Sequence, residues 1–217
     1  MTLFPGGMHG AYLRSDLVRS VGAYAVRIAV YEGTLSTFCR GVLIEARTAT
    51  TMWTRAAAAL LLAGPDAAIS GFTVLELHGC TATPGGPIDV IAPYYRKLRR
   101  RPGVAAHHGR FTDRDVVHLH DVRVMTISHS LAEVLCRGSR DHAFACADQV
   151  LAQVPRSRRA ELRADVEKQI MARHDPRGRR SALTLLPLAS GSAESPAESR
   201  CFLRLYDAGL PAPQRQY

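Results

Sequence analysis

The chain has 217 residues, a length that allows one or two domains. Hydrophobic residues make up 47% of it and charged residues 22%, so a buried core can form and a disordered chain is excluded. The net charge of +9 comes almost entirely from arginine and favours an anionic partner such as nucleic acid, although arginine enrichment is also typical of a GC-rich genome.

Residues 11–45 are predicted to form a small unit of two helices and a strand pair. Ser15 is a candidate N-cap of the first helix, Gly22 ends this helix, and the second helix spans Tyr24–Tyr31. The apolar and β-branched stretch around Gly41 suits a strand pair or β wing. Helix, turn, helix and wing in this order are typical of a winged helix-turn-helix.

The rest of the chain mixes helical and β patterns. Helices are predicted over 51–62, 70–77, 130–136, 142–154, 158–172 and 196–208, and strands over 88–91, 103–107, 115–120 and 122–125. We therefore expect an α/β protein with a winged helix-turn-helix domain at 1–48, a mixed α/β domain at 49–190, and a linker and helix at 191–217.

The densest positive charge lies in a six-residue stretch that holds five cations. They are Arg96, Lys97, Arg99, Arg100 and Arg101. Such a cluster can neutralise several phosphates and release their counterions, and arginine also pairs bidentately with phosphate or guanine. This loop is therefore a predicted DNA contact, the alternative being a solvated loop without a partner.

Two further arginines lie where a winged helix-turn-helix meets DNA. Arg27 belongs to the second predicted helix and Arg40 to the predicted wing, and both complete the predicted DNA-binding set. Apolar neighbours such as Val26 and Val30 support the alternative, in which the helix only packs against its own unit.

No catalytic, cofactor or metal site is predicted. The His and Cys pairs at 78 and 80, 107 and 108, and 118 and 120 lack the ligand spacing of a zinc site. The motifs GxSxG, GxxxxGK[ST] and GxGxxG are absent. We therefore expect a protein that is not an enzyme, with no cofactor and no metal.

The cysteine pattern and the hydropathy indicate where the protein works. The five cysteines are odd in number and none forms a CxxC pair, which indicates reduced thiols in the cytoplasm. The longest apolar run, residues 56–63, is shorter than the ~20 residues of a membrane span, and the N-terminus has no signal-peptide pattern. We expect a cytoplasmic protein with no membrane contact.

Several short motifs together resemble the AbiEi-type antitoxin and regulator family. They are the pairs Gly64-Pro65 and Ser70-Gly71, the stretch RRPGV at 100–104, the pair His107-His108 and the segment ESPAESR at 194–200. The resemblance covers most of the chain. It implies a winged helix-turn-helix transcriptional repressor or antitoxin of a toxin–antitoxin system, with double-stranded DNA and a cognate nucleotidyltransferase-type toxin as partners.

The C-terminal tail is similar to the start of a very-short-patch-repair-like endonuclease domain found in longer relatives. Glu198 matches the glutamate of the first helix of that domain, but one carboxylate cannot hold a catalytic metal, and Glu133 stands where the family has an aspartate. Two alternatives therefore remain. The chain could be a truncated, catalytically inactive relative of the endonuclease, or a toxin-binding module without DNA binding.

Overall fold

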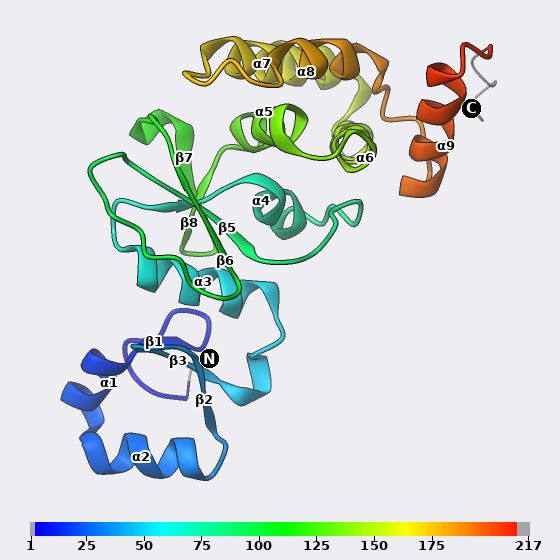
Figure 1. Cartoon of the computed structure of the whole chain (residues 1–217). Coiled ribbons are helices and arrows are strands. Elements are labelled where there is room, and N and C mark those ends of the chain that lie inside the picture. Colours follow the sequence, from blue (N-terminus) through cyan, green and yellow to red (C-terminus); the bar gives the residue numbers. More distant parts are fainter. Residues whose placement is uncertain (1–2, 212–217) are drawn as a thin grey trace. The chain divides into compact units, whose positions relative to one another are not determined.

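The computed structural model describes residues 3–211 and contains helices and two β-sheets, which confirms the α/β class (Figure 1). The chain divides into two compact units. Unit 1 contains Met1–Thr73 and Gly86–Met125, and unit 2 contains Val74–Gly85 and Thr126–Tyr217. The predicted boundary after residue 48 falls inside unit 1, and the one after residue 190 falls inside unit 2, so the three-part division stays a prediction. No helix among residues 3–211 is long and apolar enough to cross a membrane.

Unit 1 begins with two short helices flanked by three strands. The order is β1 (Ala11–Leu13), α1 (Arg14–Val21), α2 (Ala23–Tyr31), β2 (Leu35–Cys39) and β3 (Val42–Glu45). The strands form an antiparallel sheet in the order β1-β3-β2. Gly22, with φ at 87°, permits the abrupt corner between α1 and α2, as predicted. Tyr12, Leu17, Val26 and Leu43 fill the core between the sheet and the helices.

The predicted N-cap at Ser15 is wrong. Helix α1 begins at Arg14, directly after β1, and the Ser15 hydroxyl donates to the carboxylate of Asp16 at 3.3 Å. The backbone N–H of Arg14 instead donates to the carbonyl oxygen of Gly41 at 2.9 Å. One free donor at the start of the helix is therefore satisfied by the β2–β3 turn, a partner far along the chain.

The second sheet of unit 1 has five short strands in the order β6-β5-β4-β8-β7. They are β4 (Ala68–Ile69), β5 (Ile88–Ala92), β6 (Val104–His108), β7 (Val116–Leu119) and β8 (Val122–Met125). Strands β5 and β6 are parallel, as are β4 and β8, and the other neighbours are antiparallel. The sheet is therefore mixed, and the connection between β5 and β6 has to cross from one end of the sheet to the other.

Helix α3 (Met52–Ala63) lies between the two sheets of unit 1 (Figure 1). Thr51 caps its N-terminus, because its hydroxyl accepts a hydrogen bond from the backbone N–H of Thr54 at 3.2 Å. The four alanines of residues 56–59 are fully buried, and Ala57 and Ala58 pack against β1 and β3. A helix that is apolar on all sides has to be covered on all sides, and its alanines let both sheets approach closely.

Unit 2 is helical in its described part. After α4 (Gly71–Leu77), which crosses from unit 1, come α5 (Ile127–Arg137), α6 (Arg140–Ala152), α7 (Arg159–Ala172), α8 (Arg179–Leu185) and α9 (Pro196–Asp207). Helix α9 packs on α6, where the rings of Phe144 and Phe202 stack with centroids 5.9 Å apart (Figure 1). Helix α8, which the sequence analysis did not predict, begins at Arg179 directly after Gly178.

A buried carboxylate holds the C-terminal segment of unit 2 in place. Asp148, on α6, accepts hydrogen bonds from the backbone N–H groups of Ser190 at 2.8 Å and Gly191 at 2.7 Å, and from the hydroxyl of Ser199 at 2.9 Å. These donors are charge-assisted partners of a carboxylate, which is the arrangement that makes its burial tolerable. The predicted linker at residue 191 is thus an ordered part of unit 2.

A second buried carboxylate, Glu45 at the end of β3, ties together the N-terminal part of unit 1. It accepts hydrogen bonds from the hydroxyl of Tyr12 at 2.5 Å, the backbone N–H of Leu3 at 2.6 Å and the Nε of Arg47 at 2.8 Å. Burial alone would raise the pKa of Glu45, but these three donors outweigh it and hold the pKa below its ordinary value.

Replacing Glu45 with glutamine should therefore destabilise unit 1 in a pH-dependent way. A lowered pKa in the folded state stabilises the fold above the unfolded-state pKa of ~4.3, and this contribution is lost as the pH falls through the folded-state value. We expect E45Q to lose about 1–3 kcal/mol of the free energy of unfolding at pH 7 and to approach the wild type in strong acid. Urea unfolding followed by the fluorescence of Trp53, the one tryptophan, measures this.

The matched control is Glu32→Gln, which removes the same charge from an exposed position after α2. An equal loss at pH 7 and at pH 3 in E45Q would contradict the charged role of Glu45.

Candidate nucleic-acid interface

Residues 93–103, the basic loop, connect the parallel strands β5 and β6. The loop carries all five of the clustered cations, and its two tyrosines, Tyr94 and Tyr95, are 59% and 73% exposed. The ring of Tyr94 stacks on His108 of β6 with centroids 6.3 Å apart. The loop ends at Gly103, where a φ of 76° suits glycine. Basic and aromatic side chains therefore share one exposed segment, a composition suited to phosphates and bases.

Arg96 is the cation that anchors the basic loop to the protein. Its Nε lies 3.4 Å from the carboxylate of Asp66, and its Nη2 donates to the carbonyl oxygen of Ala63 at 3.4 Å. The guanidinium lies directly over Gly64, where a Cβ would come within 1.9 Å of Nη2. A cation at this point also faces the negative end of the α3 dipole. The backbone carbonyl of Arg96 in turn bonds to the ring Nε2 of His108 at 2.8 Å.

The neighbouring cations of the loop are turned to solvent. Lys97, Arg99 and Arg100 are exposed, and no ion pair or side-chain hydrogen bond of theirs is found within residues 3–211. A solvated cation without a protein carboxylate keeps its charge available to an anion. The prediction treated all five cations alike, whereas the structure separates one anchor from the rest.

The remaining cation, Arg101, lies beside the β2–β3 turn. Burial raises the pKa of the Cys39 thiol at the end of β2, and the positive charge of Arg101 opposes part of this rise. The next residue, Arg40, is exposed at the turn, and the first residue of α1, Arg14, is exposed and bonds to this turn through its backbone. Arg40 thus lies on this turn, Arg14 is joined to the turn through its backbone, and the charge of Arg101 reaches the thiol at its edge.

Arg14 was missed by the sequence reasoning, which looked for clusters along the chain. The only local signal is its position as the cation that follows a buried strand and opens a helix. Its neighbourhood depends on the pairing of β2 with β3, so local sequence alone does not reveal it.

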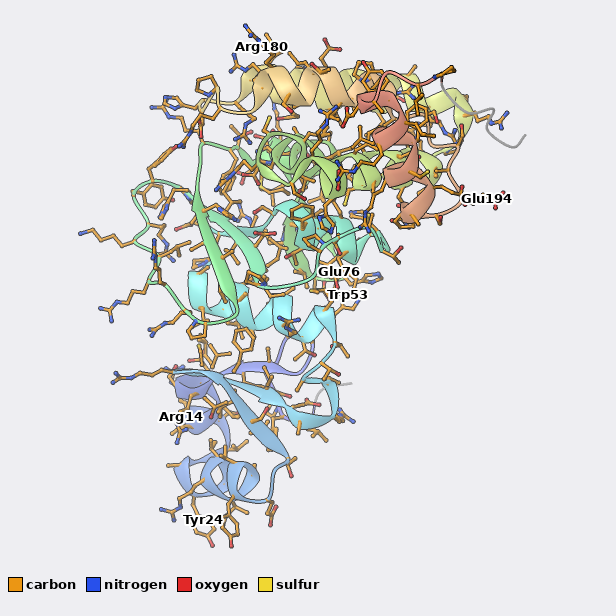
Figure 2. All side chains as sticks on the ribbon, turned by 45° about the vertical axis from the view of Figure 1, so that its right-hand side comes forward. Arg14, Tyr24, Trp53, Glu76, Arg180 and Glu194 are labelled. Carbon is orange, nitrogen blue, oxygen red and sulfur yellow. The ribbon has the colours of Figure 1, made fainter. Side chains whose placement is uncertain are left out.

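Helix α2 presents an exposed stripe of three side chains. Tyr24, Arg27 and Tyr31 follow the i, i+3, i+7 spacing of one helix face, and the two tyrosines are 68% and 87% exposed. The guanidinium carbon of Arg27 lies 5.3 Å from the centre of the Tyr24 ring, a cation–π distance. Figure 2 shows Tyr24 pointing away from the unit. Val26 faces the core instead, so the apolar residues of this helix do not occupy its outer face.

The histidines of unit 1 contact several different partners. His9 stacks on Trp53 with centroids 5.5 Å apart, and His120 meets the same ring edge-on at 5.0 Å. His107 contacts the carboxylate of Asp89 at 2.9 Å. In the part of the chain that the structure describes, no group of three or more His, Cys, Asp or Glu side chains is placed to hold a metal ion.

Glu198, the residue that matches the endonuclease helix, caps α9. Its carboxylate accepts hydrogen bonds from the backbone N–H of Glu194 at 2.9 Å and from the hydroxyl of Ser195 at 3.2 Å, and its own N–H donates to that hydroxyl. Ser195 is the N-cap, because its hydroxyl accepts from the backbone N–H of Glu198 in the first turn, and the Glu198 carboxylate accepts from the N–H of Glu194 just before the helix. These hydrogen bonds explain the position of the Glu198 side chain without a bound metal ion.

Similar known proteins carry no description of a function. No family model matches the chain. The uncharacterized proteins MT2308 and Rv2248, from two strains of Mycobacterium tuberculosis, are 39% identical to it over 85 residues. That match covers 39% of this chain and only 30% of each relative.

One solved structure resembles the fold over most of the chain. The crystal structure of the RV2827C protein from Mycobacterium tuberculosis has a TM-score of 0.52 and 13% identity, and the match covers 89% of this chain and 75% of that one. At this identity the similarity concerns the fold alone, and it agrees with a mixed α/β architecture.

If Arg96 anchors the basic loop, its removal should loosen the loop. We expect Arg96→Ala to be cut by trypsin within residues 97–101 several-fold faster than the wild type, because proteolysis follows local opening. Mass spectrometry of the first fragments locates the cut. Arg99→Ala, which also removes one trypsin site but no anchor, should leave the rate within about twofold. Equal rates for the two variants would show that the contacts of Arg96 do not hold the loop.

Proposed function

We propose that this chain is a double-stranded-DNA-binding protein in which residues 11–45 act as a winged helix-turn-helix. The observation that carries the proposal is that Arg40 is exposed on the β2–β3 turn, to which the exposed Arg14 bonds through its backbone, while the basic loop carries three solvated cations. Support for the winged arrangement comes from the order β1-α1-α2-β2-β3 and the antiparallel sheet β1-β3-β2.

In this proposal the β2–β3 turn and the basic loop provide affinity, whereas helix α2 provides sequence specificity. The β2–β3 turn acts as the wing and the basic loop extends it, so both contact phosphates and supply most of the affinity. Helix α2 acts as the recognition helix, and its exposed face brings Arg27 to the base edges between two tyrosines. Tyrosine hydroxyls beside the groove would contact the backbone, which fixes the register of the helix.

The wider role we propose is transcriptional repression in the cytoplasm, without catalysis, as the antitoxin of a toxin–antitoxin pair. Its support is the order of the motifs shared with AbiEi-type proteins, including the RRPGV stretch in the basic loop. The partner toxin in this proposal is a nucleotidyltransferase, and co-purification with the product of the adjacent gene tests it. A chain that binds such a toxin but no DNA would instead be a toxin-binding module.

Removing the charge of the basic loop should weaken binding to any DNA. The binding constant of such a protein for DNA falls as the salt concentration rises. For the triple variant Arg99→Ala, Arg100→Ala, Arg101→Ala, we expect the plot of its logarithm against the logarithm of the salt concentration to become less steep, by about 0.9 for each phosphate that the loop no longer neutralises. Fluorescence anisotropy with a labelled duplex over a sodium chloride series measures the slope.

The matched control removes three exposed arginines of unit 2, Arg156, Arg158 and Arg180, and so lowers the net charge equally. If both triple variants shift the slope by the same amount, net charge rather than the basic loop determines the affinity.

The recognition role of α2 predicts a weakening confined to specific DNA. A bidentate arginine–guanine contact is worth ~1–3 kcal/mol, so Arg27→Ala should weaken binding to the chain's own upstream DNA by ~5–150-fold and binding to random DNA little. Arg40→Ala, a backbone contact, should weaken both about equally. Arg19→Ala, on α1 and paired with Asp16, is the control and should change neither. Unchanged binding of Arg27→Ala to both DNAs would leave α2 with a packing role only.

A further inference from the structure

Unit 1 holds a cavity of about 300 Å³ beneath the basic loop. Its floor is formed by α3, β5 and β6, where Ala59, Ala63 and Ala106 contribute only methyl groups. A larger side chain at Ala106, which lines this space and is half-buried, would reduce its volume. The volume lies at the lower end of the ~300–1,000 Å³ typical of sites for small organic ligands.

The other wall of the cavity is cationic. Lys97, Arg99 and Arg101 line it from the basic loop, together with the anchored Arg96. Among the described residues that line it, none is acidic. The one carboxylate nearby, that of Asp66, is already paired with Arg96. Three cations without a protein carboxylate thus face an apolar floor.

This combination selects a class of ligand by charge and polarity. An inorganic anion would satisfy the cations and leave the alanine floor in contact with water. A neutral apolar molecule would cover the floor, but it would also displace water from the cations without supplying a negative charge to pair with them, which is unfavourable. A small anion with a short apolar chain satisfies both surfaces, because its head pairs with the guanidinium groups and its chain lies on the methyl groups.

We propose that this cavity is a binding site for a small organic anion with a short aliphatic chain, its carboxylate or phosphate head held by Arg99 and Arg101. A second role of the ligand rests on the proposed function, in which the basic loop binds DNA. There the ligand acts as an effector, because it neutralises the cations that DNA phosphates need, so the bound ligand weakens DNA binding.

Isothermal titration calorimetry of the full chain tests the site directly. Octanoate and octyl phosphate represent the two possible heads, octanol the chain without charge, and inorganic phosphate the head without a chain. We expect at least one of the two anionic chains to bind at least about tenfold more tightly than either partial probe, since a charge-assisted contact and apolar burial each contribute. Equal binding of octanol, or tighter binding of the nucleotide AMP, would overturn the proposed ligand class.

Two variants locate the binding. Arg99→Ala should weaken octanoate or octyl phosphate at least about tenfold, whereas Arg100→Ala, which removes the adjacent cation that does not line the cavity, should change it less than about threefold. Ala106→Leu should abolish binding by filling the space while it keeps every charge, with the fold checked by circular dichroism. If Ala106→Leu misfolds, the pair of arginine variants still decides. Equal effects of Arg99→Ala and Arg100→Ala would overturn the site.

The effector role is tested separately by DNA binding at saturating ligand, against sodium chloride at the same ionic strength. A several-fold rise in the Kd for DNA supports it, and no rise overturns it while the calorimetric site stands. If the chain binds no DNA under any condition, the proposed function fails, and the calorimetry alone decides whether the cavity binds the anion.

Discussion

Close packing of helix α3 against two sheets is the constraint on which unit 1 depends. The four alanines of residues 56–59 have no exposed surface, and the hydroxyl of Thr54 donates to the backbone carbonyl of His9 at 2.6 Å, which joins the helix to the N-terminal segment. A leucine at Ala57 or Ala58, which pack against β1 and β3, would have to push this sheet away, because a closely packed interface has no room for the larger side chain. The last of the four alanines, Ala59, also lines the cavity under the basic loop.

The C-terminal end of α3 determines the position of the basic loop, which carries the densest positive charge of the chain. Gly64 leaves the space that the guanidinium of Arg96 occupies, and this one contact places the start of the basic loop over the helix end. Lys97, Arg99 and Arg100 have no ion pairs among the described residues, so their charge stays available to a partner. The same residue type therefore has two roles in this loop. Arg96 stabilises the fold because it has protein partners, whereas Arg99 and Arg100 keep a free charge because they have none among the described residues.

Each unit also contains a carboxylate that is buried and fully engaged. Glu45 collects donors from the N-terminal segment, from β1 and from Arg47 just after β3, while Asp148 holds the segment that leads to α9. Removing the donors of such a group leaves an uncompensated charge, so both units are sensitive to substitution at these positions.

The sequence by itself predicted most of the helices and strands to within a few residues of their ends, but not the short strands β1 and β4 or helix α8. The glycines at 22, 33 and 64 predicted where the helices α1, α2 and α3 end. Each of them has a positive φ, which only glycine adopts without strain. The apolar stretch around Gly41 predicted the β2–β3 pair, and the all-apolar run at 56–63 predicted a helix. The predicted DNA contacts rest on local charge density, and all of them are exposed except the anchor Arg96 and the half-buried Arg101.

Only the tertiary structure decided how these charges are grouped. The neighbourhood of Arg101 and Cys39 joins residues 62 positions apart, the anchor of Arg96 lies on a preceding helix, and the N–H of Arg14 finds its acceptor in a turn that follows two further elements. Such contacts depend on strand pairing and helix packing, which involve partners distant in sequence and leave no periodic pattern along the chain. Composition and spacing therefore predict that the surface is basic, whereas long-range packing decides which arginines support the fold and which face a partner.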